Sequence, residues 1–314
     1  MSDGTTALFS YEEVRKNFIK SFFLVAILLA LAFGISYWIG IAMNNPGMGI
    51  LIGVVVCLVV IPIQILTAKW VILGMARGRK ADPDNLREQR AIRIVEGLAI
   101  SAGLKKTPEL YIVPSQVPNA FASGLSENSA FVAVTEGLLG MMDDQELEGV
   151  IGHEIGHIIH RDIMLNQLVV GLISVILILA IILERVLWIR SLSGDRRSNN
   201  RENGGNLALV MLVLMLAAIL VRPIAMLIGQ LLQLAISRQR EYAADACSVQ
   251  LCSYSEGLAR ALEKLGGEGR YSKKEAESLG GSELACMYIN FPGEGLFSTH
   301  PPIAERVKRL RSMY

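Results

Sequence analysis

The run His153-Glu154-Ile155-Gly156-His157 fits the pattern HExxH. On a helix, residues four positions apart share a face, so the two imidazoles can bind one metal ion. Glu154 projects beside them, where a carboxylate can take a proton from a metal-bound water. The pattern therefore predicts a zinc site on a helix. The alternative interpretation is an amphipathic helix with two surface histidines.

The residues around this motif predict the helix that it needs. Asp143 and Glu146 have the spacing of a capping box, and an apolar stripe follows at helical spacing (Leu147, Val150, Ile151, Ile155, Ile158). His160 shares the face of the motif histidines but lies about 10.5 Å along the axis from His153. A metal bonded to His153 at about 2 Å cannot reach His160, so a third ligand must come from elsewhere.

Glu241 is the carboxylate best suited to be that third ligand. Catalytic zinc sites often take a carboxylate, and Glu241 shares a helix face with Asp245, four positions on. The two acidic groups repel each other unless each has a partner, such as a metal for Glu241 and a ligand imidazole for Asp245. Ala244 would let this face approach another helix closely. The alternative is a solvated face with Arg238 and Arg240 as counter-charges.

The composition indicates a membrane protein. Of the 314 residues, 52% are hydrophobic and 19% are charged, and the mean hydropathy is +0.43. The formal net charge of +1 gives no indication of a nucleic-acid partner. The four cysteines (57, 247, 252 and 286) show no CxxC pairing, so free thiols are expected rather than a disulfide framework.

A transmembrane hairpin is predicted near the N-terminus. No charged residue occurs between Ser21 and Ala68, and Asn44-Asn45-Pro46-Gly47 divide this stretch into Phe22–Met43 and Met48–Ala68. Each half is long enough to cross a hydrocarbon core of about 30 Å. Basic residues follow the second half but are absent from the turn, which places the N-terminal tail and the chain after the hairpin in the cytoplasm.

The segment before the zinc helix predicts a small sheet. An amphipathic helix is expected over residues 82–104, and strands are expected at Leu110–Val113 and Ala130–Thr135. Between them, Asn119-Ala120-Phe121-Ala122 is an extended segment that could lie at the sheet edge beside the metal and pair with a peptide backbone. The alternative is an ordinary strand next to a turn.

A second hydrophobic hairpin is expected after the zinc helix. Ile163–Leu183 is uncharged, an arginine-rich loop follows, and Leu207–Val221 and Ile224–Ser237 return the chain. The loop arginines and Arg222 leave open whether this pair crosses the membrane or lies shallowly against it. Because the two ends of a hairpin are neighbours, it would bring Glu241 close to His157.

The expected organisation has five parts. They are a cytoplasmic tail (1–20), a transmembrane hairpin (21–76), the first part of a protease domain with the HExxH helix (77–162), a second membrane hairpin (163–236), and the second part of the protease domain with the third zinc ligand (237–314).

These residues together resemble the HtpX family of membrane-integrated zinc metalloproteases, which is related to the CAAX prenyl endopeptidases. The likeness covers almost the whole chain and is strongest at Asn119–Gly124, His153–His157, Ser237–Asp245 and Ser298–Arg306. It implies a mainly α membrane protein with an α+β gluzincin-like zinc metalloprotease domain. A small mixed sheet would lie beside the HExxH helix.

The resemblance also implies roles for individual residues. His153, His157 and Glu241 would bind one Zn²⁺ per chain, with Glu154 as the general base. Asp245 would orient a ligand histidine. His300 would stabilise the oxyanion, and Arg306, its arginine, would pair with an acidic residue. The substrate-binding edge would be formed by four residues (Asn119, Ala120, Phe121, Ala122).

The activity expected from the resemblance is that of a membrane-bound zinc-dependent endopeptidase. It would sit in the inner membrane as a multi-pass protein, with the catalytic domain on the cytoplasmic side. Its partners would be the lipid bilayer and protein substrates, above all misfolded or damaged membrane proteins under envelope stress. The alternatives are a CAAX-prenyl-protease-like processing enzyme, a non-catalytic zinc-binding membrane scaffold and a transporter. The last is disfavoured because no internal repeat is visible.

Overall fold

The computed structural model describes residues 5–124, 128–160, 162–192, 240–267 and 301–313. The labelled helices are α1 (Thr5–Ala42), α2 (Pro46–Ala76), α3 (Leu86–Ser101), α4 (Glu136–Met141), α5 (Asp144–Ile159), α6 (Asp162–Leu192), α8 (Glu256–Gly267) and α10 (Ile303–Arg311). The strands are β1 (Arg79–Lys80), β2 (Glu109–Val113), β3 (Ala120–Ser123) and β4 (Phe131–Thr135). Residues 240–252 are also helical.

The chain forms two compact units. One comprises Met1–Ile19, Thr67–Asn166 and Gln233–Tyr314, and the other comprises Lys20–Leu66 and Gln167–Leu232. The first unit holds the sheet and the HExxH helix, α5. The described residues of the second unit are the apolar parts of α1, α2 and α6.

Within the part of the chain that the structure describes, three helices are long and apolar enough to cross a membrane, which agrees with the prediction of a membrane protein. Their apolar spans are Val25–Ala42, Pro46–Ala76 and Leu168–Arg190. At the turn between α1 and α2, Asn44 has a positive φ of 56°. Arg190, near the end of α6, donates hydrogen bonds to the Ala42 carbonyl and to Asn44 Oδ1. A cation is favourable at the C-terminus of a helix such as α1.

Helices α1 and α6 extend beyond the segments that the sequence predicts. The predicted polar tail 1–20 is helical from Thr5, and no proline or glycine interrupts the chain between Thr5 and Gly34. Helix α6 continues past Leu183, through the charged residues Glu184, Arg185 and Arg190, to Leu192. The return of the second hairpin, Leu207–Val221 and Ile224–Ser237, lies outside the described residues.

The sheet is mixed, as expected, and its strand order is β1-β2-β4-β3. β2 pairs with β4 in parallel, whereas β1 with β2 and β3 with β4 are antiparallel. Among the described residues β3 pairs with β4 alone, which makes it an edge strand. β3 carries Ala120, Phe121 and Ala122 of the predicted extended segment.

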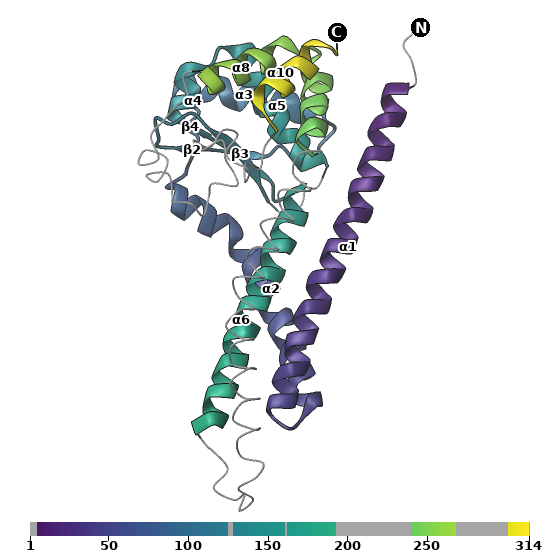
Figure 1. Cartoon of the computed structure of the whole chain (residues 1–314). Coiled ribbons are helices and arrows are strands. Elements are labelled where there is room, and N and C mark those ends of the chain that lie inside the picture. The colour runs from purple at the N-terminus through teal and green to yellow at the C-terminus, as the bar shows by residue number, and fades with distance from the viewer. Residues whose placement is uncertain (1–4, 125–127, 161, 193–239, 268–300, 314) are drawn as a thin grey trace, which may run out of the picture. The chain divides into compact units, whose positions relative to one another are not determined.

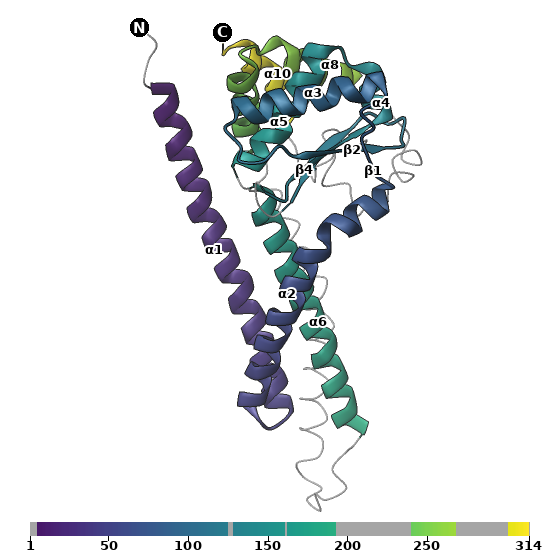
Figure 2. The ribbon, with the colours of Figure 1, turned by 180° about the vertical axis from the view of Figure 1, so that it is seen from behind.

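The two faces of the sheet pack against different helices. Alternate strand residues, such as Ala120 and Val132, join α3, α5 and α8 in one buried core. Figures 1 and 2 show these helices, with α10, on one side of the sheet. The intervening residues, such as Phe121 and Phe131, face the last turns of α2, where Leu73 is buried among them.

Helix α5 begins and ends where the sequence predicts. The side chain of Asp143 accepts a hydrogen bond from the backbone N–H of Glu146, and the Glu146 side chain accepts one from the Asp143 N–H. This reciprocal capping box satisfies two donors that a helix start otherwise leaves without partners. His160 is the C-cap residue, so it lies at the helix end, away from His153. α5 contacts both β3 and β4.

Candidate active site

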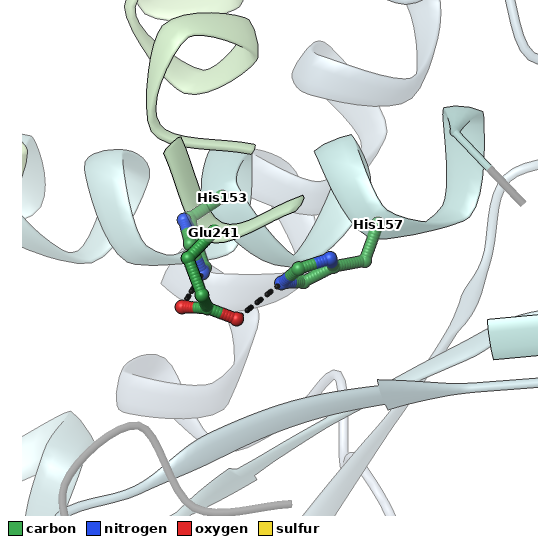
Figure 3. A group of neighbouring side chains, drawn as sticks. All are labelled: His153, His157 and Glu241. Atoms are coloured by element: carbon green, nitrogen blue, oxygen red, sulfur yellow. Dashed lines mark ion pairs between the residues drawn. The ribbon is translucent and has the colours of Figure 1, made fainter. Parts of the chain in front are cut away.

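The two motif histidines and Glu241 meet at one point. His153 and His157 project from α5 toward the Glu241 carboxylate, which comes from the helical residues 240–252 (Figure 3). His153 Nε2 lies 3.5 Å from Glu241 Oε2, and His157 Nε2 lies 3.4 Å from Glu241 Oε1. His153 and Glu241 are almost fully buried, whereas the His157 side chain keeps 17% of its exposure. The predicted meeting of a distant carboxylate with the HExxH histidines is present in the structure.

The donor set fits a tetrahedral zinc ion. One donor atom from each of these three residues can be chosen so that all lie within 4.8 Å of one another. With metal–ligand bonds of about 2.1 Å, the corners of a tetrahedron are about 3.4 Å apart. The two nitrogen–oxygen separations, 3.5 and 3.4 Å, match that spacing. Two imidazoles and a carboxylate are the protein ligands of one class of catalytic zinc site, in which the fourth position is left to water or substrate.

Asp245 contacts His153 at Nδ1, the ring nitrogen that does not face Glu241, and Arg306 in turn contacts Asp245. His153 Nδ1 lies 2.9 Å from Asp245 Oδ1, and Arg306 donates to both oxygens of that carboxylate from Nε (2.9 Å) and Nη2 (2.7 Å). An ionised carboxylate can only accept, so Nδ1 carries the proton and Nε2 keeps its lone pair for a metal. The arrangement is the carboxylate–histidine support expected behind a metal ligand.

This network shifts the pKa of each of its members. Burial alone lowers the pKa of His153, but the carboxylates of Asp245 and Glu241 outweigh it and raise the pKa. Burial raises the pKa of Asp245, yet the Arg306 guanidinium and His153 bring it below its usual value. Arg306 is held cationic in full burial by Asp245 and Glu241. The surroundings of Asp245 therefore keep this carboxylate ionised, so it can accept the proton of His153 Nδ1.

Close packing brings the two ligand-bearing helices together. A Cβ added to Gly156 would lie 3.2 Å from Ala244 Cα and 3.2 Å from Cys247 Cβ. One added to Gly152 would lie 2.9 Å from Ser248 Oγ. The hydroxyl of Ser248 donates to the Gly149 carbonyl of α5 at 2.7 Å. The absence of side chains at these glycines lets the helix of Glu241 approach α5 closely enough for the carboxylate to reach the histidines.

Three further residues were predicted for the site: Glu154, Asn119 and His300. Glu154 is buried on α5, with 4% of its surface exposed. Asn119 is also buried, just before the edge strand β3, and its backbone N–H donates to Thr135 Oγ1 at 2.9 Å. His300 lies outside the described residues.

Of the cysteines, 57, 247 and 252 are free, in line with the prediction, and 286 lies outside the described residues.

Two features of the site were missed by reasoning from the sequence. One is the glycine contact, although the glycines at 149, 152 and 156 follow helical spacing and could have indicated a close helix neighbour. The other is the stacking of Arg309 on Tyr242, with the guanidinium carbon 3.8 Å from the ring centroid. This contact ties α10 to the helix of Glu241, and no sequence spacing indicates it.

Histidines one turn apart on a buried helix, a carboxylate from a second helix and a mixed sheet alongside are the arrangement of a metallopeptidase. Helices of membrane-spanning length and composition are typical of a membrane protein.

Residues 85–314 match Peptidase family M48, and the chain belongs to that family, in its HtpX type. It is 37% identical over 309 residues to a protease HtpX homolog of Streptococcus uberis, covering 96% of this chain and 99% of that protein. A protease HtpX homolog of Listeria monocytogenes serovar 1/2a is 37% identical over 317 residues, with the same coverage. The crystal structure of S. mikatae Ste24p shares the fold, with a TM-score of 0.51 and 20% identity over 96% of this chain and 67% of that one.

Proposed function

We propose that this protein is a zinc-dependent endopeptidase in which His153, His157 and Glu241 bind one Zn²⁺ per chain. The observation that carries the proposal is the meeting of these three side chains, with nitrogen–oxygen separations of 3.5 and 3.4 Å and Asp245 fixing the tautomer of His153. Membership of a peptidase family supplies the reaction class, hydrolysis of a peptide bond.

Glu154 is the proposed general base. Bound zinc would supply a Lewis acid and lower the pKa of its water from about 15.7 toward about 7. Glu154, one position after His153 on α5, takes the proton as the water oxygen attacks the peptide carbonyl. It then delivers the proton to the leaving amine. Asp245 and Arg306 hold His153 in place throughout, and His300 is proposed to stabilise the oxyanion.

The edge strand β3 is proposed to bind the substrate backbone. The Thr135 N–H donates to the Asn119 carbonyl at 2.9 Å, and bonded pairs alternate along an antiparallel ladder. Phe121 therefore directs its backbone groups toward β4, while those of Ala120 and Ala122 point to the outer edge. A peptide added there would lie beside α5, which contacts β3.

The proposed clients are misfolded or damaged membrane proteins, and the proposed role is quality control during envelope stress. The protein would act in the inner membrane, with the catalytic residues on the cytoplasmic side. The basic residues that follow α2 and are absent from the α1–α2 turn support this orientation. Prenyl-protein processing has less support, because the likeness to Ste24p, at 20% identity, concerns the fold alone.

The test uses the full chain purified in detergent. Cleavage of an unfolded membrane protein is measured before and after a zinc chelator, and again after zinc is added back. We expect cleavage to stop with the chelator and return with zinc. In parallel, Glu154→Gln should keep the metal and lose cleavage by about 10²- to 10⁴-fold, because the base is gone and the ligands remain.

Glu148→Gln is the matched control, since Glu148 lies on α5 with a different angular position and belongs to no part of the proposed site. Its cleavage rate should equal that of the unaltered protein. Unchanged proteolysis in Glu154→Gln would refute the proposed mechanism, and cleavage that persists without metal would refute the zinc dependence.

A further inference from the structure

Three aromatic rings form a ladder across the face of the sheet that is turned away from α5. Tyr111 on β2 meets Phe131 on β4 edge to face, with ring centroids 5.5 Å apart. Phe131 meets Phe121 on β3 in the same manner at 6.4 Å. Edge-to-face pairs at these distances are favourable beyond the area that they bury. The ladder therefore runs from the inner strands to the edge strand.

The last turns of α2 are packed onto this ladder. The Lys69 ammonium lies 5.1 Å from the Tyr111 ring centroid and 5.6 Å from that of Phe131. It also forms a 2.6 Å ion pair with Glu109 on β2. Leu73, one turn further along α2, is 6% exposed and lies in the same buried cluster as Phe121 and Phe131.

The end of α2 is fixed where it makes these contacts. The Gly78 N–H donates to the Leu73 carbonyl at 2.8 Å, and Arg77 has a positive φ of 52°. This is the bonding of a helix C-cap. The chain then passes directly into β1, whose Arg79 pairs with Ile112 of β2. The helix end cannot move away from the sheet without breaking this connection or the ladder.

We propose that the last turns of α2 position β3, the strand proposed to bind substrate, through their packing against the Phe121 side chain. The inference rests on the proposed role of β3 in binding substrate. An edge strand is held by backbone hydrogen bonds on one side, so side-chain packing decides where its outer edge lies. Phe121 is the β3 residue whose ring belongs to the ladder, and the neighbouring Ala120 and Ala122 offer the backbone groups for substrate. The membrane helix thereby sets the position of the substrate backbone relative to the metal site.

The test compares Leu73→Ala with Leu66→Ala in the full chain. Both remove the same atoms from the same helix, but Leu66 is 72% exposed and Leu73 is buried against the ladder. The substrate is an unstructured peptide of about ten residues, long enough to run along an edge strand. For Leu73→Ala we expect KM to rise about 3- to 10-fold while kcat changes little, since substrate alignment is lost and the catalytic residues are unchanged.

Metal content and rescue separate positioning from general loss of structure. Metal per chain should be the same in both variants, because His153 and its partners lie on the other side of the sheet. Leu73→Met, which refills the space, should restore KM. Lys69→Met, which removes the ion pair and the cation over the rings, should raise KM in the same direction as Leu73→Ala.

Two results would overturn the inference. In the first, KM in Leu73→Ala equals that of the unaltered protein. In the second, kcat and metal content fall together with substrate binding, as for a merely structural residue. A different result, the absence of chelator-sensitive cleavage in the unaltered protein, would overturn the proposed function itself and with it this inference.

Discussion

Two arginines on α10, five positions apart, meet carboxylates in opposite surroundings. The Arg306 side chain is fully buried and pairs with Asp245 at 2.7 Å and with Glu241 at 3.4 Å. The Arg311 side chain is 45% exposed and pairs with Glu256 at 2.7 Å and with Glu263 at 2.8 Å. The distances are similar, but only the first cluster includes Glu241, one of the proposed metal ligands.

The two clusters differ in whether water can solvate the partner carboxylates once the arginine is removed. In water the carboxylates of Glu256 and Glu263 are solvated once Arg311 is gone, so exposed pairs contribute little to stability. In the buried cluster the Asp245 carboxylate would stay buried without the cation that both its oxygens contact, which is strongly unfavourable. We therefore expect the buried Arg306 to be necessary for the stability of the site, whereas the exposed Arg311 contributes little to the stability of the protein.

The sharpest way to break the comparison is to replace both arginines by the same residue. Arg306→Met should lower the free energy of unfolding by about 3–5 kcal/mol, because it leaves the buried Asp245 carboxylate without its cation. It should also weaken metal binding, because Asp245 is then no longer held in place beside His153. Arg311→Met should leave the unfolding midpoint and metal content unchanged. Denaturant unfolding and metal analysis of the two purified variants check this. Equal effects of the two substitutions would contradict the assigned importance of burial.

The second prediction concerns the carboxylates of the same two clusters. Asp245→Asn keeps the shape of the side chain but removes the negative charge next to His153 Nδ1. An amide can also donate a hydrogen bond, so it no longer ensures that the proton stays on Nδ1. Metal affinity should therefore fall about 10- to 100-fold. Glu263→Gln, the corresponding change in the exposed cluster, should leave metal affinity unaltered. Competition with a zinc chelator measures both affinities. An Asp245→Asn variant with unaltered affinity would show that the Asp245–His153 contact does not support the metal.

The third prediction compares a tight glycine with an open one. Gly156→Ala places a methyl group 3.2 Å from Ala244 and should push the helix of Glu241 outward, which weakens metal binding several-fold. Gly97, on α3, has no atom within 4 Å of an added Cβ, and Gly97→Ala should raise the free energy of unfolding by about 0.5–1 kcal/mol. Chelator competition and thermal unfolding measure the two effects. An equal gain in stability in both variants would contradict the close helix contact.

The smallest effect is expected from a pair of intermediate exposure, Lys69 and Glu109. Lys69 holds the pKa of Glu109 down at about 2. Because the folded pKa lies below the unfolded value of about 4.3, the pair stabilises the fold above that pH and is lost as the pH falls toward 2. The carboxylate is one-third exposed, so the contribution is about 1 kcal/mol or less.

Denaturant unfolding at a series of pH values checks this last prediction. The stability difference between the unaltered protein and Glu109→Gln should be largest near neutral pH and shrink on the acid side. A difference that grows as the pH falls would have the wrong sign for a carboxylate with a lowered pKa.

The sequence predicts best what depends on local spacing. The HExxH face, the capping box of Asp143 and Glu146 and the end of α5 at His160 all follow from residues within one helix. The strands β2 and β4 follow from their apolar runs, since parallel or buried strands are apolar on both faces. Short elements escape this kind of reasoning. β1, with two residues, and α4, with six, are too brief to show a period.

The parts of the site that depend on helices meeting are harder to predict. The sequence indicates Glu241 as a ligand because a hairpin returns the chain there, but it does not measure how closely the helices pack. Arg306 enters from the last helix, 61 residues after Asp245, and was expected only from a family resemblance. Its complete burial and bidentate pairing depend on tertiary packing that no local pattern encodes.

The central claim is that Glu241 completes a metal site begun by His153 and His157. Metal analysis of the detergent-purified full chain, beside Glu241→Ala and Glu154→Gln, tests it most directly. The account predicts one zinc per chain in the unaltered protein and in Glu154→Gln, and little or none in Glu241→Ala. Full zinc occupancy in Glu241→Ala, with unaltered affinity, would contradict it.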